Sequence, residues 1–405
     1  IEVLSVIAQQ LLVLREGRLA GKNNINLLTP QGQFGTRLQG GDDAASPRYI
    51  FTNLAPIARK IFMKEDDDVL EYLEDEGKTI EPDVFAPIIP MVLVNGANGI
   101  ATGWSTNLPM FDPLAVIDTL TKKINNEPCA KLVPWYRDFT GTIEKQDNSY
   151  ITKGKWFFGQ KNTLHITELP IGTWTEPFIS KILKQSASSK SNLKNAIIKH
   201  ADNSSDLKVN VVFTLSTDAY TKYSTNEDQL VKDFYLTTNL PMTNIHLLNE
   251  NNTIQKYNDV ESIIEAFMTF RLTKYEQRKA FLLKNLNETL HELTNKKKFI
   301  YAVIDGSIPL HKVKHEVTIN AMNELNIGEA FHEKFLALAL SSLNLERIHQ
   351  LNKQIKRLER DLNTLASMSI QDMWLRDLEQ LKQTLTRKHK TKFVLPNNAK
   401  VICIE

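Results

Sequence analysis

An arginine and a tyrosine that are adjacent in the sequence, Arg48 and Tyr49, are the residues with the clearest potential for covalent chemistry. An ordinary phenol ionises near pH 10 (about three units above neutrality), so a tyrosine nucleophile needs a nearby cation to stabilise the phenolate or a transferred phosphate. Arginine also binds phosphate through two parallel hydrogen bonds. The pair therefore indicates phosphoryl chemistry, and the alternative is a tyrosine that belongs to a hydrophobic core.

The segment that precedes this pair is rich in glycine. Gly35 and Gly41 would let a ligand come close to the backbone, and Arg37, in the sequence FGTR, could add a second phosphate contact. The alternative is that the glycines only form turns. Both a ligand-binding loop and a structural loop are consistent with this composition.

A second glycine-rich segment, residues 87–112, presents one apolar residue, Ile100, among Gly96, Gly99 and Gly103. The spacing matches neither the GxGxxG fingerprint nor the P-loop, so nucleotide binding is not indicated. An apolar side chain on a turn of small residues can wedge between base steps and bend a duplex. The alternative is that Ile100 fills a local core.

Composition restricts the classes of protein to which the chain can belong. A length of 405 residues predicts two or three domains, and the net charge of +2 requires any nucleic-acid surface to be local. Cys129 and Cys403 are far apart, and the acidic run at 64–83 lacks the spacing of a calcium loop, so no metal site is predicted. No apolar run is long enough for a membrane helix, so no membrane partner is expected.

The patterning of the chain changes twice along its length. Residues 1–130 mix short helical patterns with turns, and residues 131–257 contain β-like runs that predict an α/β domain. Residues 260–304 contain no Gly or Pro, which predicts a helix of roughly 65 Å.

Two leucine-rich series predict that this helix pairs with a later one. The later series has apolar residues spaced alternately three and four apart, as in a coiled coil: Ile348, Leu351, Ile355, Leu358, Leu362 and Leu365. The 260–304 helix carries a shorter series at Leu283, Leu286, Leu290 and Leu293. Antiparallel pairing would leave residues 305–340 as a helical cap, and the alternative is an ordinary helical bundle.

Several segments, in order, resemble the DNA breakage and rejoining region of type IIA DNA topoisomerases, in particular the eukaryotic and large-virus topoisomerase II branch. They include GQFGTRLQGGDDAASPRYIFTNLAPIARKIF, EPDVFAPIIPMVLVNGANGIATGWSTNLP, ITELPIGTWTEPF and FRLTKYEQRK. The resemblance extends over roughly residues 21–385. Its order, rather than any single motif, makes it specific.

The resemblance implies roles for individual residues. Tyr49 would attack a DNA phosphodiester and become joined to the 5′ phosphate, with Arg48 supporting the phosphate, and Ile100 would intercalate in bent DNA. The further DNA contacts that we expect are Gly35, Arg37, Gly41 and Asn98. The active-site histidine of the family has no counterpart before His165.

The implied fold is multidomain, mainly α with α+β parts. Its expected regions are a winged-helix-type domain at 1–130, a tower-like α/β domain at 131–257, an ascending coiled-coil arm at 258–304, a helical exit gate that dimerises at 305–340, a descending arm at 341–390 and a C-terminal segment at 391–405.

The implied activity is that of an ATP-dependent type II topoisomerase, which cuts one duplex transiently, passes a second through and religates the first. Mg²⁺ and ATP would be bound by domains absent from this chain, which alone should bind and bend DNA but cleave it poorly. The expected partners are double-stranded DNA and a second copy of the chain. The expected location is intracellular: the nucleus for a cellular enzyme, and the host cytoplasm or nucleus for a viral one. The alternative is a non-catalytic, DNA-bending scaffold that dimerises through its coiled coil.

Overall fold

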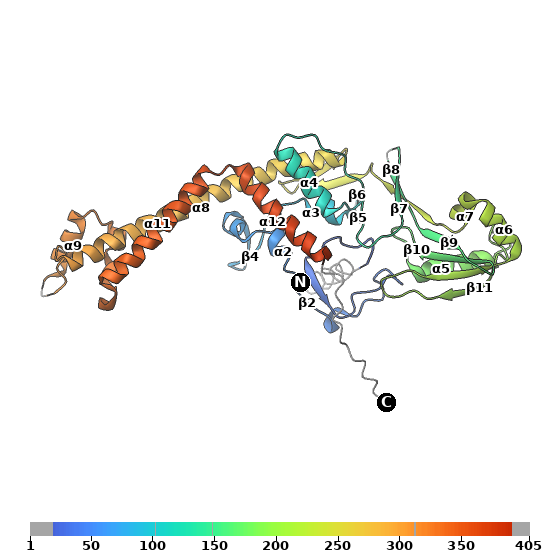
Figure 1. The fold of residues 1–405 in the computed structure, drawn as a ribbon, viewed down its shortest axis with the longest axis horizontal. Helices are drawn as coiled ribbons and strands as arrows, with labels where there is room; N and C mark the ends of the chain where they lie inside the picture. The colour runs from blue at the N-terminus through green and yellow to red at the C-terminus, as the bar shows by residue number, and fades with distance from the viewer. Residues whose placement is uncertain (1–18, 102, 148, 312, 391–405) are drawn as a thin grey trace, which may run out of the picture. The chain divides into compact units, whose positions relative to one another are not determined.

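The computed structural model of the chain describes residues 19–390 except for 102, 148 and 312 (Figure 1). The first part of the expected winged-helix-type domain, the expected C-terminal segment and Cys403 lie outside the described residues. The chain divides into two compact units. The first comprises residues up to Lys64, Val84–Arg271 and residues from Leu375, and the second comprises Glu65–Asp83 and Leu272–Trp374. Among the described residues, no helix is long and apolar enough to cross a membrane.

The first unit contains a pair of strands next to the tyrosine segment and a set of helices. Strand β1 (Leu28–Gln31) pairs antiparallel with β2 (Phe51–Leu54). The helices are η1 (Pro47–Tyr49), α2 (Ala58–Ile61), α3 (Met91–Asn95) and α4 (Pro113–Ile124). Helix α4 begins where the Asp112 carboxylate accepts a hydrogen bond from the backbone N–H of Leu114, a standard N-cap. The helices bury their apolar residues Ala58, Ile61, Leu93, Val94, Val116, Ile117 and Leu120.

Small antiparallel sheets complete this part of the first unit. Strand β5 (Ala97–Ala101) pairs with β6 (Trp104–Leu108), and β14 (Ile245–Leu248) pairs with β15 (Ile254–Tyr257). A three-stranded sheet has the order β13 (Thr237–Pro241), β8 (Ser149–Lys153) and β7 (Thr142–Gln146).

A four-stranded antiparallel sheet with helices on one face forms the α/β part of the first unit (Figure 1). Its order is β11 (Ile197–Asp202), β12 (Val211–Leu215), β10 (Thr163–Glu168) and β9 (Lys155–Phe158). Side chains alternate along β10 and β12, because successive residues of a strand point to opposite faces. The buried face packs against α5 (Thr175–Ala187), α6 (Thr217–Thr225) and α7 (Glu227–Asp233).

The second unit is built around two long helices. Helix α8 (Val260–Ile304) enters it from the first unit, and α11 (Leu345–Ser367) lies alongside α8 (Figure 1). The Lys279 ammonium of α8 donates hydrogen bonds to the carbonyls of Ala366 and Met368 at the end of α11. Between them in the sequence lie α9 (His315–Glu324), η3 (Glu329–Phe331), α10 (His332–Leu336) and η4 (Leu340–Ser342). Apolar residues of α9, η3 and α10 pack on both helices.

The remaining elements are η2 (Lys64–Val69), the hairpin of β3 (Tyr72–Asp75) and β4 (Lys78–Pro82), and α12 (Ile370–Lys390). Helix α12 differs from the expected continuous descending arm. The chain leaves helical conformation at Met368, and a new helix begins after Ser369, whose hydroxyl accepts a hydrogen bond from the backbone N–H of Asp372. A serine in this position favours a helix start over continuation, because its hydroxyl satisfies a free N–H.

The structure confirms the mixed architecture of helices and sheets and the long helix over 260–304. It also confirms that the apolar series on α11 faces inward. Ile348, Leu351 and Ile355 are buried, whereas Leu358, Leu362 and Leu365 are half-buried.

Candidate functional site

Tyr49 is an exposed residue at the end of η1, so the alternative that it belongs to a hydrophobic core does not hold. Pro47 starts this single 3₁₀ turn, because its fixed φ suits a first helical position. The Tyr49 N–H donates to the Ser46 carbonyl at 2.9 Å, and 65% of the residue's surface is accessible. The Arg48 guanidinium lies over the Tyr49 ring, 4.8 Å from its centroid. A phenol and a cation are thus presented together at the surface.

The arrangement is suited to an attack on a large substrate. Both side chains of the pair are exposed, and the neighbouring strand β2 exposes every residue, including Phe51 and Leu54. A guanidinium next to a phenol can stabilise the negative charge that develops on a phosphate. Within the described part of the chain, no three His, Cys, Asp or Glu side chains are grouped to bind a metal ion.

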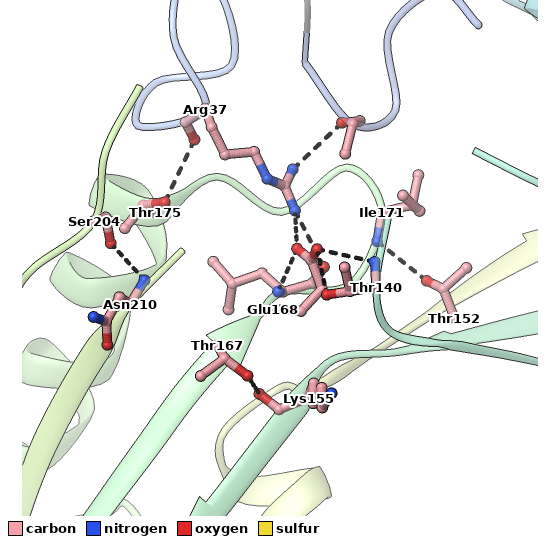
Figure 2. A network of polar contacts seen from close by, with 12 residues as sticks. Arg37, Thr140, Thr152, Lys155, Thr167, Glu168, Ile171, Thr175, Ser204 and Asn210 are labelled. Carbon is pink, nitrogen blue, oxygen red and sulfur yellow. Dashed lines mark hydrogen bonds and ion pairs between the residues drawn. The ribbon is translucent and has the colours of Figure 1, made fainter. Parts of the chain in front are cut away.

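Arg37 is buried, which contradicts the expectation that it contacts DNA phosphate. Only 1% of its surface is accessible, and its Nη2 atom lies 2.9 Å from Oε1 of Glu168 (Figure 2). The same nitrogen donates to the Leu169 carbonyl at 3.2 Å, and the guanidinium lies over the ring of Trp174. A guanidinium held in this way is part of the scaffold rather than a phosphate ligand.

Glu168 satisfies the buried charge of Arg37 and ties together several chain segments. Its Oε1 also accepts from the Leu169 N–H at 3.0 Å, and its Oε2 accepts from the N–H and hydroxyl of Thr140 at 3.2 Å each (Figure 2). Buried charges are tolerated when they are paired and their remaining lone pairs are used. The network therefore anchors the loop that leads to Tyr49 onto the end of β10.

The same loop is closed on itself. Asp43 accepts from the Thr36 N–H at 2.9 Å, and the Gly40 N–H donates to the Thr36 carbonyl at 2.8 Å. Gly35 has φ +89°, and a Cβ there would lie 2.3 Å from Cα of Gly41, which is itself buried with φ +102°. These glycines allow two backbone segments to touch, so the structural alternative describes Gly35 and Gly41 better than contact with a ligand.

Ile100 is exposed at 91%, so the alternative that it fills a core is wrong. It lies on β5 opposite Ser105 of β6, close to the turn of the hairpin. Asn98 on the same strand is also exposed, and a Cβ added at Gly99 or Gly103 would meet no atom. The hairpin thus projects a bare apolar side chain into solvent, which is unfavourable unless something covers it.

Two groups that contact the candidate site segments escaped the sequence analysis. The first is Glu168, although the alternation along TLHITE puts it on the buried face of β10, where a charge demands a partner. The second is the segment 244–248, which contacts the Ile100 hairpin through Asn244 and His246. No local signal points to the second group, because its partners are about 140 residues away.

Comparison with known proteins agrees with this geometry. The family model for the A-type subunit of DNA gyrase/topoisomerase IV matches residues 17–379. The chain belongs to this family. The predicted resemblance to type IIA topoisomerases is thereby confirmed.

Members of the family in several organisms are similar to most of this chain. The mitochondrial DNA topoisomerase 2 of Dictyostelium discoideum is 37% identical over 386 residues, which are 91% of this chain and 29% of that protein. DNA topoisomerase 2 of Plasmodium falciparum is 34% identical over 414 residues, 93% of this chain and 29% of that protein. The chain therefore spans less than a third of the length of these relatives.

A solved structure of the family has the same fold. The crystal structure of the Plasmodium falciparum topoisomerase II DNA-binding, cleavage and re-ligation domain superposes with a TM-score of 0.83 at 33% sequence identity. The match covers 95% of this chain and 55% of that one.

Proposed function

We propose that this chain is the tyrosine-bearing part of the DNA-binding and cleavage core of a type II DNA topoisomerase. The observation that carries the proposal is the exposure of Tyr49 beside Arg48, on a loop anchored by a buried ion pair, in a chain of this family. A core tyrosine would have no access to a duplex, whereas this one does. The proposal also draws on the printed description of the Plasmodium structure, which names DNA binding, cleavage and re-ligation.

Cleavage in this proposal is a transesterification at Tyr49. The phenol oxygen attacks the phosphorus, the bond from phosphorus to the 3′ oxygen breaks, and a bond from the tyrosine to the 5′ phosphate forms. The phenol loses one proton and the departing 3′ hydroxyl gains one. One phosphodiester replaces another, so the free 3′ hydroxyl can attack the tyrosyl phosphate and reseal the strand without an external energy source.

Arg48 supports this step electrostatically. Its guanidinium is within 4.8 Å of the ring centroid and is exposed, so it can turn from the ring to a phosphate oxygen that approaches Tyr49. Two parallel N–H donors suit the two non-bridging oxygens. We assign Mg²⁺ and ATP to parts of the enzyme outside this chain, and they enter no step described for its residues.

Ile100 bends the duplex in this proposal. An apolar wedge between base steps unstacks them at a cost of a few kcal/mol, which contacts with the bent DNA offset. Exposure of Ile100 and the neighbouring Asn98 on a projecting hairpin supports this role.

The organisation of the chain follows the same proposal. We assign the region up to residue 130 to a winged-helix-type domain, 131–257 to a tower-like domain, and α8 with α11 to a coiled-coil arm. Residues 305–340 would form an exit gate at which two copies meet across a twofold axis. The location would be intracellular: the nucleus for a cellular enzyme, and the cytoplasm or nucleus of the host for a viral one.

A covalent-trapping experiment tests the proposal. The complete enzyme, with its metal-binding and ATPase parts, is incubated with Mg²⁺ and a duplex labelled at its 3′ ends, because the fragment that becomes joined to Tyr49 carries the 3′ end of the cut strand, and is then denatured. We expect label on the protein, and none with Tyr49→Phe although that variant still binds DNA. Binding and bending without any transfer of label by the unmodified enzyme would contradict the nucleophile and favour the non-catalytic scaffold.

A further inference from the structure

The hairpin that carries Ile100 is too small to be rigid by itself. Strands β5 and β6 have five residues each, and among the side chains whose burial is described only Leu108 is buried. An isolated two-stranded hairpin is marginally stable in water. A wedge that unstacks bases must nevertheless keep one conformation when it inserts. A disordered hairpin would have to become ordered on binding DNA, and this loss of entropy would weaken binding to the bent duplex.

A distant segment provides that support through hydrogen bonds along β6. The Asn107 N–H donates to the Asn244 carbonyl at 2.8 Å, and the Asn244 side-chain amide donates to the Ser105 hydroxyl at 2.8 Å. One step further, the His246 N–H donates to the Thr106 hydroxyl at 3.3 Å. Three consecutive residues of β6 are therefore bound by the segment 244–246.

The His246 ring completes this attachment. Its Nδ1 atom lies 3.0 Å from the Ser105 carbonyl oxygen, and a carbonyl can only accept, so Nδ1 carries the hydrogen. The ring also meets Trp104 edge to face, with centroids 5.3 Å apart. Ser105 and Trp104 are the β6 partners of Ile100 and Ala101, so these contacts act directly behind the wedge.

The β14–β15 hairpin also continues the apolar surface beside the wedge. A groove of about 300 Å³ is lined by residues of both hairpins: Ile100, Trp104, His246, Leu247, Leu248 and Ile254. Ile100, Trp104, Leu248 and Ile254 are all exposed. Two elements far apart in sequence thus form one surface around the wedge.

We propose that Asn244 and His246 are positioning residues that hold the Ile100 hairpin in the conformation that bends DNA. This inference rests on the proposed role of Ile100 as a wedge. Neither side chain needs to touch the duplex. Their hydrogen bonds to Ser105 and the His246 contact with Trp104 fix the hairpin before DNA binds. The hairpin therefore loses its conformational entropy when the protein folds, and this loss does not reduce the free energy of DNA binding.

The test compares bending with binding in the same protein. Bending is measured as the end-to-end distance of a duplex labelled with two fluorophores, and binding as the anisotropy of a singly labelled duplex at fixed salt. For Asn244→Ala and for His246→Ala we expect the ratio of bent to unbent complexes to fall about tenfold, the effect of losing one or two hydrogen bonds. The affinity should change less than about threefold, since phosphate contacts dominate it.

Three controls make the result specific. His246→Asn keeps a side-chain N–H that can reach the Ser105 carbonyl and should recover part of the bending. His200→Ala removes an exposed histidine from β11, in a different sheet, and should leave bending unchanged. In the free protein, hydrogen exchange of the β6 amides should accelerate in Asn244→Ala, whereas exchange in β10 should not.

A double variant separates positioning from direct contact. If Asn244 acts through Ile100, Asn244→Ala adds nothing once Ile100→Ala is present, so the two effects are not additive. Additive losses, or unchanged hydrogen exchange in β6, would overturn the positioning role. Reduced bending with Ile100→Ala but not with Asn244→Ala or His246→Ala would also overturn it and leave the wedge intact. Unchanged bending with Ile100→Ala would defeat the wedge itself.

Discussion

The tyrosine loop, residues 32–49, and the β5–β6 hairpin each expose a candidate functional residue, Tyr49 and Ile100, but they are held in different ways. The loop is anchored by a buried ion pair between Arg37 and Glu168. Its backbone also touches itself where Gly35 lies against Gly41. The hairpin is held by hydrogen bonds to side chains that are only partly buried, without an ion pair between the described residues of the two segments. We interpret the difference as one of required precision, because an in-line attack tolerates less displacement than the insertion of a wedge.

The largest expected effect separates the two regions by function. Tyr49→Phe removes the phenol oxygen, so we expect cleavage by the complete enzyme to fall by about 10⁴-fold or more while DNA bending stays unchanged. Ile100→Ala should reduce DNA bending, and it should reduce cleavage only in proportion to the loss of bending. Trapped covalent label and fluorescence end-to-end distance report the two quantities. Loss of bending in Tyr49→Phe would contradict the separation.

The second largest effect concerns the anchor of the tyrosine loop. Glu168→Ala leaves the buried Arg37 guanidinium without its carboxylate, so the free energy of unfolding should fall by about 3–5 kcal/mol. Urea denaturation measures this change. The double replacement Arg37→Met with Glu168→Leu should recover much of the loss, since no unpaired charge then remains.

A surface pair supplies the matched control for this anchor. Arg357 and Asp361 on α11 form an ion pair at 3.8 Å whose side chains are 82% and 55% exposed. Arg357→Ala should change the free energy of unfolding by less than about 1 kcal/mol. Equal effects at Glu168 and Arg357 would mean that the buried pair does not anchor the loop.

A pair of glycine variants sharpens the comparison at the level of the backbone. Gly35→Ala places a Cβ 2.3 Å from Cα of Gly41 at positive φ, and we expect a loss of about 1–3 kcal/mol in unfolding free energy with reduced cleavage. Gly99→Ala in the hairpin meets no atom within 4 Å and should be nearly neutral. Thermal unfolding of both variants measures this difference. A destabilised Gly99→Ala with an unaffected Gly35→Ala would contradict the view that close backbone contact constrains the tyrosine loop and not the hairpin.

The smallest expected effect comes from acid and involves neither region. Burial alone would raise the pKa of Asp233, but hydrogen bonds from Gln229, Asn192 and Tyr223, together with the charge of Lys222, outweigh it and hold the pKa below its ordinary value. A carboxyl with a depressed pKa stabilises the fold above its unfolded pKa and loses that contribution as pH falls through the folded pKa.

Urea midpoints at several pH values below about 5 measure this loss, with Asp233→Asn as the control. The unmodified protein should lose more stability than the variant as pH falls. Parallel curves for the two proteins would mean that Asp233 does not titrate differently on folding.

Local patterns predicted the features that depend on neighbouring residues. The helix over 260–304 follows from a run without Gly or Pro, and the inward face of α11 follows from three- and four-residue spacing. The break at Met368 was missed, because the capping serine that follows it sits in an otherwise helical pattern. Helix termini depend on a single side-chain hydrogen bond, which periodicity does not report.

The sequence by itself determined that Arg48 and Tyr49 are neighbours, that Ile100 stands among small residues, and that a long helical arm follows. Only the tertiary structure decided which of the candidate residues reach solvent. Arg37 resembles a phosphate ligand in sequence and is instead buried against Glu168, 131 residues away, and His246 reaches β6 across 141 residues. Burial and pairing depend on segments that meet only when the chain folds, and a charged side chain carries no local mark of whether its partner will be water, a ligand or another residue.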